Sequence, residues 1–151
     1  MRYLIGLGNY TAGDDAVGVH VVEYVVANGL DRGFAAVDLS TNALNLVSYL
    51  EPDTEAVLVI DAARLDLEPG EYRFFSCSEV ESQKELAGLS THEGDPLRVL
   101  SLAAGAGYPI PPLAIMGIEP QDMASGIGLS ERLAERVPAY AAAAIERLFQ
   151  L

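Results

Sequence analysis

Carboxylates and one imidazole, side chains that could do chemistry together, follow the apolar segments of this chain. Asp14 and Asp15 come shortly after a first apolar run, Asp61 ends a second one, and His92 lies just before a predicted helix. Two carboxylates and an imidazole suit a first-row divalent metal ion and leave coordination positions for water or substrate. The sequence therefore predicts a metal-contacting site built from one of the paired aspartates, Asp61 and His92.

Each of these residues also has a purely structural interpretation. Asp14 or Asp15 can cap the helix that follows them. His92 can lie in solvent while the Ser-Thr pair before it caps the next helix. Asp61 is harder to explain in this way, because a carboxylate that closes a fully apolar strand would be partly desolvated without compensation.

Apolar periodicity predicts the elements that position these side chains. Short apolar runs alternate with helical patterns, which indicates parallel strands joined by helices. The run 72–75 follows a Pro-Gly turn without an intervening helix, so we expect an antiparallel edge strand there. The prediction is one α/β domain over residues 1–151, with three α/β/α layers and a mostly parallel twisted sheet of about five strands. We expect strands at 3–7, 34–38, 56–60, 72–75 and 113–118. We expect one helix from Asp14 or Asp15 to about residue 28, and further helices over 44–50, 96–104 and 130–148.

Ligands of such sheets bind beyond the carboxyl ends of the strands, which is where the candidate residues fall. Residues 76–94 show no period and form the longest predicted loop, which makes this loop a further functional candidate.

Charge and cysteine content exclude several classes of function. Nine Lys and Arg against 22 Asp and Glu give a net charge of −13, which disfavours nucleic acid and anionic membranes as partners. The single cysteine, Cys77, rules out an internal disulfide, and the sequence has no candidate membrane span. We therefore expect a cytoplasmic protein that meets a neutral or cationic partner, which could be another protein.

Other catalytic or binding motifs are incomplete. Gly6 and Gly8 end the first strand as in dinucleotide-binding folds, but position 11 is threonine, and the paired aspartates would repel a pyrophosphate. Cys77 could serve as a nucleophile, although nothing in the sequence activates it. An aspartic-protease dyad would need two Asp-Thr/Ser-Gly loops, which the chain lacks.

Several blocks along the chain carry a resemblance to a known family. Residues 6–9 (Gly-Leu-Gly-Asn) and 14–19 (Asp-Asp-Ala-Val-Gly-Val) resemble the opening of the nickel-iron hydrogenase maturation endopeptidases. Matching blocks follow in the family's order at 57–63 (Val-Leu-Val-Ile-Asp-Ala-Ala), 90–93 (Ser-Thr-His-Glu), 112–120 (Pro-Leu-Ala-Ile-Met-Gly-Ile-Glu-Pro) and 128–130 (Gly-Leu-Ser).

The resemblance implies an activity, a partner and a set of site residues. Members of that family remove a carboxyl-terminal extension from the hydrogenase large-subunit precursor after nickel has been inserted. Their metal-contacting and catalytic positions fall on Asp15, Asp61 and His92. The nickel is then expected to be carried by the substrate, and another divalent ion such as zinc could occupy the site in vitro.

One segment departs from the family pattern. Where the family shows an Asp-Gly-Gly-Thr-x-Gly type segment, only Asp38 and Thr41 match, and we expect these two residues and Asn9 to line the substrate cleft. Loss of the glycines should stiffen this loop. Two alternatives stay open: a non-catalytic chaperone that senses nickel loading, and a hydrolase similar to peptidyl-tRNA hydrolase, which shares the opening Gly-Leu-Gly-Asn.

Overall fold

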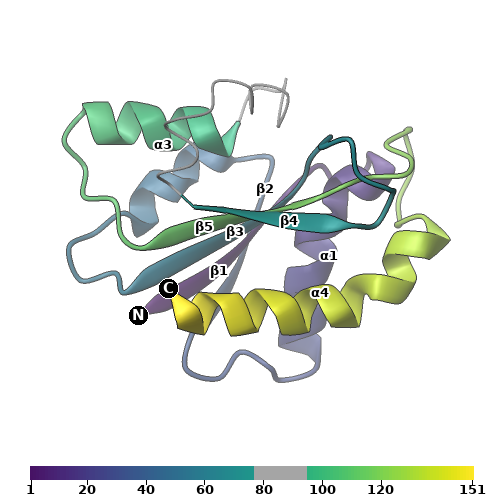
Figure 1. Cartoon of the computed structure of the whole chain (residues 1–151), viewed down its shortest axis with the longest axis horizontal. Helices are drawn as coiled ribbons and strands as arrows, with labels where there is room; N and C mark the ends of the chain where they lie inside the picture. Colours follow the sequence, from purple (N-terminus) through teal and green to yellow (C-terminus); the bar gives the residue numbers. More distant parts are fainter. Residues whose placement is uncertain (77–94) are drawn as a thin grey trace.

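One five-stranded sheet forms the centre of the computed structural model, which describes residues 1–76 and 95–151 (Figure 1). The strand order is β2-β1-β3-β5-β4, and β4 is antiparallel to its neighbour β5 while the other pairs are parallel. This confirms the predicted α/β class and the antiparallel edge strand. The strands are β1 (Arg2–Leu7), β2 (Ala35–Ser40), β3 (Ala56–Ala62), β4 (Tyr72–Ser76) and β5 (Leu113–Ile118).

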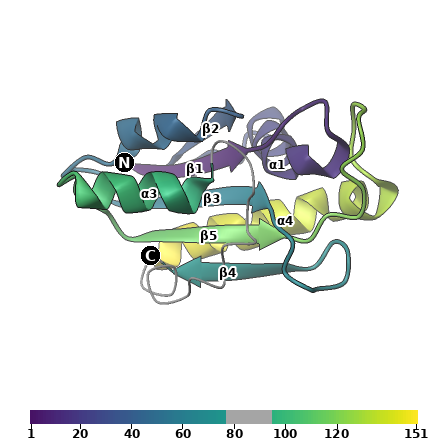
Figure 2. The same ribbon diagram turned by 90° about the horizontal axis from the view of Figure 1, so that it is seen from above.

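Helices cover both faces of the sheet. Alternate strand residues point to opposite sides, so each face presents apolar side chains that helices bury. In β3, Leu58 and Ile60 pack with α1 and α4, whereas Val57 and Val59 pack with η2 and α3. Figures 1 and 2 show α4 and α3 on opposite sides of the sheet. No helix among residues 1–76 and 95–151 is long and apolar enough to cross a membrane. The helical elements are η1 (Gly13–Ala16), α1 (Val17–Ala27), η2 (Ala43–Tyr49), α3 (Pro96–Gly105) and α4 (Glu131–Gln150).

The structure corrects three local predictions. The expected helix 44–50 is a 3-10 helix, and neither Asp14 nor Asp15 caps η1 or α1 with its side chain. The strand expected to stop at residue 60 continues to Ala62, because Asp61 and Ala62 still pair with β5. Asp61 therefore lies inside a strand and not after it. The predictions for Cys77, His92 and most of the loop 76–94 fall outside the described residues.

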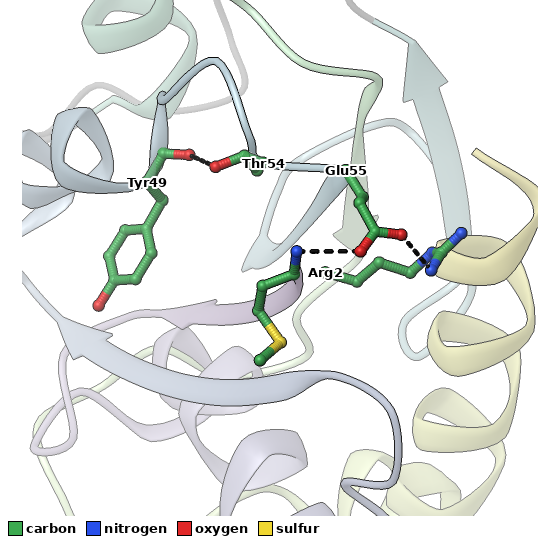
Figure 3. A network of polar contacts seen from close by, with 5 residues as sticks. Arg2, Tyr49, Thr54 and Glu55 are labelled. Atoms are coloured by element: carbon green, nitrogen blue, oxygen red, sulfur yellow. Dashed lines mark hydrogen bonds and ion pairs between the residues drawn. The ribbon is translucent and has the colours of Figure 1, made fainter.

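The amino-terminal ends of β1 and β3 are tied together at the end of the sheet away from the candidate site (Figure 3). Glu55 accepts hydrogen bonds from the amino group of Met1 at 3.0 Å and from Arg2 Nη1 at 2.7 Å. The Thr54 hydroxyl donates to the carbonyl oxygen of Tyr49 at 2.8 Å. Exposed ion pairs of this kind contribute little stability, so their main effect is to support the register in which β1 and β3 pair.

Glycines let α1 lie unusually close to the sheet. A Cβ atom on Gly6 of β1 would stand 2.3 Å from the carbonyl oxygen of Gly18 in α1. A Cβ atom on Gly18 would stand 2.2 Å from the carbonyl oxygen of Ile60 in β3. Both obstacles are backbone atoms, which cannot rotate away, so neither position has room for a side chain.

We predict that Gly18→Ala lowers the free energy of unfolding by about 3 kcal/mol or more, since the added methyl group must displace α1 from β3. Gly105→Ala is the matched control, because that glycine ends α3 with nothing within 4 Å of its added Cβ. The control should change stability by less than about 1 kcal/mol. Urea unfolding followed by circular dichroism measures both, and equal stabilities would contradict the close packing.

Candidate functional site

Asp15 is placed at the sheet's carboxyl edge by the tight passage from β1 into η1. Gly8 has a φ of 143°, and a Cβ atom there would stand 2.0 Å from the carbonyl oxygen of Asp15. Asn9 completes the turn, because its N–H donates to Asp15 Oδ2 at 2.8 Å while its own side-chain oxygen accepts from Thr11 N–H at 3.0 Å. The partly buried Asp15 carboxylate is thus held by the backbone that leaves β1.

Asp61 points from β3 toward the side of the sheet that α3 covers. It shares the parity of Val57 and Val59, and it stands opposite Gly117 of β5 in the strand register. Its side chain is partly buried, and Oδ1 accepts the N–H of Ala62 at 2.9 Å. Because β3 is central and apolar, it carries this carboxylate into the protein.

The surroundings of Asp61 oppose its negative charge. Burial raises the pKa of Asp61 well above its usual range, and the charges of Asp15 and Asp95 raise it further, while the hydrogen bond from Ala62 acts in the opposite direction. In the described part of the chain, neither Asp15 nor Asp61 has an ion-pair partner. The two carboxylates therefore form an electrostatically unfavourable pair that a cation would stabilise.

Asp95 is a neighbour of this pair that sequence reasoning did not place among the metal-contacting residues. It caps α3, since its Oδ1 accepts the N–H of Leu97 at 2.9 Å. Burial raises the pKa of Asp95, and the backbone hydrogen bonds from Leu97 and Arg98 act against that rise. The Asp-Pro start of a helix directly after the polar loop was the available sequence signal.

Asp14 has a structural role that differs from the expected helix cap. Its side chain is fully buried and accepts four hydrogen bonds. The donors are the N–H groups of Gln121 and Asp122, both at 2.9 Å, and the N–H and hydroxyl of Ser130, at 2.7 and 2.8 Å. Asp14 thus fixes the segment between β5 and α4 against η1, and only its neighbour Asp15 is left for the site.

The three cleft candidates lie at the carboxyl ends of adjacent strands. Asn9 follows β1 and contacts Asp15, while Asp38 is an exposed residue near the end of β2 and Thr41 is exposed just after it. A hydrogen bond of 2.8 Å from Gly8 N–H to the carbonyl oxygen of Ser40 joins the two strand ends. The structure therefore brings the three candidates to one edge of the sheet.

The segment that departs from the family pattern keeps a turn without its glycines. Ser40 has a φ of 50°, a conformation that favours glycine, and Asp38 Oδ1 supports it by accepting the N–H and hydroxyl of Ser40 at 2.7 and 2.8 Å. Leu39 and Ala43 are buried in the core between the sheet and α3. Core packing and a local side-chain bond thus replace glycine in this loop.

The predicted third ligand, His92, lies outside the described residues. Among residues 1–76 and 95–151, no three His, Cys, Asp or Glu side chains are grouped closely enough to hold a metal ion. What the structure brings together is the carboxylate pair of Asp15 and Asp61, with oxygen ligands that suit a divalent cation.

Comparison with known proteins identifies the family of this chain. The family model described as hydrogenase maturation protease matches residues 19–147. The chain belongs to the hydrogenase maturation protease family. This match does not favour the chaperone or the peptidyl-tRNA hydrolase-like alternative.

Solved structures and a curated relative extend the comparison to nearly the whole chain. The hydrogenase 2 maturation peptidase from a Thaumarchaeota archaeon is 26% identical, covers 98% of both chains and has a TM-score of 0.72. The NiFe hydrogenase maturation protease from Thermococcus kodakarensis is 24% identical, covers 98% of this chain and 99% of that one, and has a TM-score of 0.77. A hydrogenase expression/formation protein from Azotobacter vinelandii is 26% identical over 121 residues, which is 80% of this chain and 58% of that protein. The chain spans little more than half the length of the curated relatives it matches.

For this member of the protease family, we predict that Asp14→Asn destabilises the fold by about 2–4 kcal/mol, because the amide would place a donor among four donors in a buried site. Ser130→Ala is the graded comparison and should cost less, since it removes one donor and leaves the backbone bonds intact. Thermal unfolding measures both. Equal, negligible effects would show that Asp14 does not hold the segment after β5.

Asp61→Asn should have the opposite effect and raise the stability of the metal-free protein by about 1 kcal/mol near neutral pH. The folded protein raises the pKa of Asp61, so ionisation of Asp61 destabilises the fold once the pH exceeds the pKa of the unfolded chain, about 4. The gain should therefore disappear toward that pH. Urea unfolding with a chelator present, between pH 4 and 8, gives the comparison, and a variant less stable than wild type at pH 8 would contradict it.

Proposed function

We propose that this chain is an endopeptidase that removes the carboxyl-terminal extension of a nickel-iron hydrogenase large-subunit precursor after nickel has been inserted. Nickel is then part of the substrate and not a resident cofactor. The observation that carries the proposal is the pairing of Asp15 and Asp61 at the carboxyl edge of the sheet without a cationic partner in the described residues. Membership of the hydrogenase maturation protease family supports the same reaction.

The carboxylate pair supplies a physical reason for recognising a nickel-loaded precursor. Mutual repulsion and burial make the free site unfavourable, and a substrate-borne cation between the two carboxylates would relieve both effects. A precursor without nickel offers no such gain, so the loaded form should bind more tightly than the nickel-free form. We assign His92 as the third contact, from its place in the Ser-Thr-His-Glu block.

The proposed chemistry is hydrolysis of one peptide bond. A divalent cation in contact with the site can polarise a carbonyl group or lower the pKa of a bound water. Asp15 and Asp61 would hold that cation against the scissile bond, and Asn9, Asp38 and Thr41 would line the path of the precursor. We place the reaction in the cytoplasm, since one cysteine among 151 residues suits a reducing compartment.

Cleavage of the loaded precursor tests this function. Purified protein should shorten the nickel-loaded large subunit and leave the nickel-free form intact, as measured by the mass of the large subunit. Asp61→Asn, Asp15→Asn and His92→Ala should each lower the rate by about 100-fold or more, since each weakens the hold on the cation that polarises the scissile bond. Asp53→Asn is the matched control, because Asp53 is exposed in the turn before β3. This variant should cleave the loaded precursor at the wild-type rate.

Two results would overturn the proposal. Equal cutting of loaded and nickel-free precursor would remove nickel-gated recognition while keeping the peptidase activity. Binding of the loaded precursor without any cleavage would instead favour a non-catalytic sensor of nickel loading.

A further inference from the structure

A tight turn of residues 9–12 leads from β1 toward η1 at the carboxyl edge of the sheet (Figure 2). The N–H of Ala12 donates to the carbonyl oxygen of Asn9 at 3.0 Å, and the side-chain oxygen of Asn9 also accepts the hydroxyl of Thr11 at 2.8 Å. The backbone N–H of Asn9 is not used within the turn and donates to Asp15 Oδ2. The conformation of this turn therefore decides whether that donor meets Asp15.

The ring of Tyr10, the second residue of the turn, stacks on the imidazole of His20 in α1. The ring centroids lie 5.0 Å apart, and the ring planes meet at 21°. His20 lies two residues after Gly18, where the backbone of α1 contacts β3, so the helix holds the imidazole in a fixed place. Two contacts thus restrain Asp15, since Asn9 binds it directly and the stacked rings join the turn to the helix that follows it.

The presence of histidine at position 20 supports a role in orienting the tyrosine ring. His20 Nδ1 lies 3.8 Å from Glu23 Oε2, whereas Nε2 is buried and has no hydrogen-bond partner among residues 1–76 and 95–151. A buried nitrogen without a partner is unfavourable, and an aliphatic side chain would cover the same surface without this cost. Only a planar ring can stack face to face and thereby fix the plane of the Tyr10 ring.

The stack lies outside the core, so its effect is local. Tyr10 is 38% exposed, and it is not among the described apolar side chains that pack on the two core clusters. Removal of its ring should therefore leave the fold intact while the turn gains freedom. A change in activity can then be separated from a change in stability.

We propose that the Tyr10–His20 stack positions Asp15 for the reaction by holding the turn 9–12 closed. The inference rests on the proposed endopeptidase function. With the turn closed, the N–H of Asn9 engages Asp15 Oδ2 and restricts rotation of the carboxylate, which leaves Oδ1 for the cation carried by the precursor. With the turn open, Asp15 can rotate, and the cation is no longer held at one distance from the scissile bond. Tyr10 and His20 are thus positioning residues that act through Asn9.

The test compares Tyr10→Ala, which removes the ring, with Tyr10→Phe, which keeps it. His20→Ala removes the other half of the stack, and the double variant with Tyr10→Ala and His20→Ala measures the coupling between the two rings. Tyr108→Ala is the matched control, because Tyr108 is a half-exposed tyrosine that follows α3. The values of kcat and KM come from the mass of the nickel-loaded large subunit over time. Amide hydrogen exchange at Asn9, followed by NMR, reports the bond to Asp15 without any substrate.

Tyr10→Ala should lower kcat about ten-fold, because Asp15 no longer holds the cation at one distance from the scissile bond. The same variant should speed amide exchange at Asn9 by a similar factor. Tyr10→Phe should keep the wild-type kcat and exchange rate, since the ring alone makes the stack. The double variant should be about as slow as each single variant, because both changes break one contact. Tyr108→Ala should match wild type in both measurements.

A wild-type kcat in Tyr10→Ala and His20→Ala, or unchanged exchange at Asn9, would overturn the positioning role. A rise in KM alone would assign Tyr10 to precursor binding instead. A fall in rate that matches a loss of folded protein in thermal unfolding would leave both rings a structural role only. Failure of wild type to cut the loaded precursor would refute the proposed function, whereas the exchange rates would still show whether the rings hold the turn.

Discussion

The close approach of α1 to the sheet is the constraint on which the site depends. Gly6 and Gly18 let the helix backbone reach the backbone of β1 and β3, and Gly8 lets Asp15 turn in directly behind β1. A side chain at any of these positions would push η1 outward and separate Asp15 from Asp61. Glycine inside a helix costs about 1 kcal/mol relative to alanine, which the buried valines of α1 offset through their packing on the sheet.

Asp14, Glu119 and Asp61 are buried or partly buried acidic residues at this end of the molecule. Their hydrogen bonds distinguish residues that hold the fold from a residue that is available to a ligand. Asp14 accepts four hydrogen bonds, and Glu119 accepts the N–H groups of Leu65 and Leu67 at 2.7 and 3.0 Å. Both carboxylates are satisfied, and both hold loops in place. Among residues 1–76 and 95–151, Asp61 accepts a hydrogen bond only from its own neighbour, Ala62, and it faces like charges. A desolvated carboxylate with this little support is more readily explained by a ligand than by the fold.

The elements were predictable wherever a local pattern determines them. The run 113–118 matches β5 residue for residue, because a fully buried central strand shows as unbroken apolar sequence. Pairing partners decide what a local pattern cannot: β3 extends past Asp61 because β5 continues beside it. The 3-10 form of residues 43–49 was not predicted, since an amphipathic spacing over so few residues fits either helix type.

The site was predictable in part for the same reason. Strand-end placement pointed to Asp61 and to the paired aspartates, and the family resemblance selected Asp15 from that pair. In the structure, the charge of Asp15 raises the pKa of Asp61. The role of Asp14 depends on Ser130, 116 residues away, and no spacing rule connects them. Asp95 likewise reaches Asp61 only through the packing of α3 on the sheet. Contacts between distant segments therefore decided which acidic residues hold the fold and which face the cleft.

The segment after β2 that departs from the family pattern forms a supported turn without glycine. Leu39 and Ala43 point into the core, so their replacement of glycine alters packing and not the surface offered to a partner. Ser40 keeps the left-handed turn because Asp38 supports it with two hydrogen bonds. The backbone beside Gly8 is thereby held with less freedom than glycine would allow. Asp38 and Thr41 keep the residue types of the family pattern, so the departures that reach the surface of this loop are the exposed Asn42 and the stiffness of the turn itself.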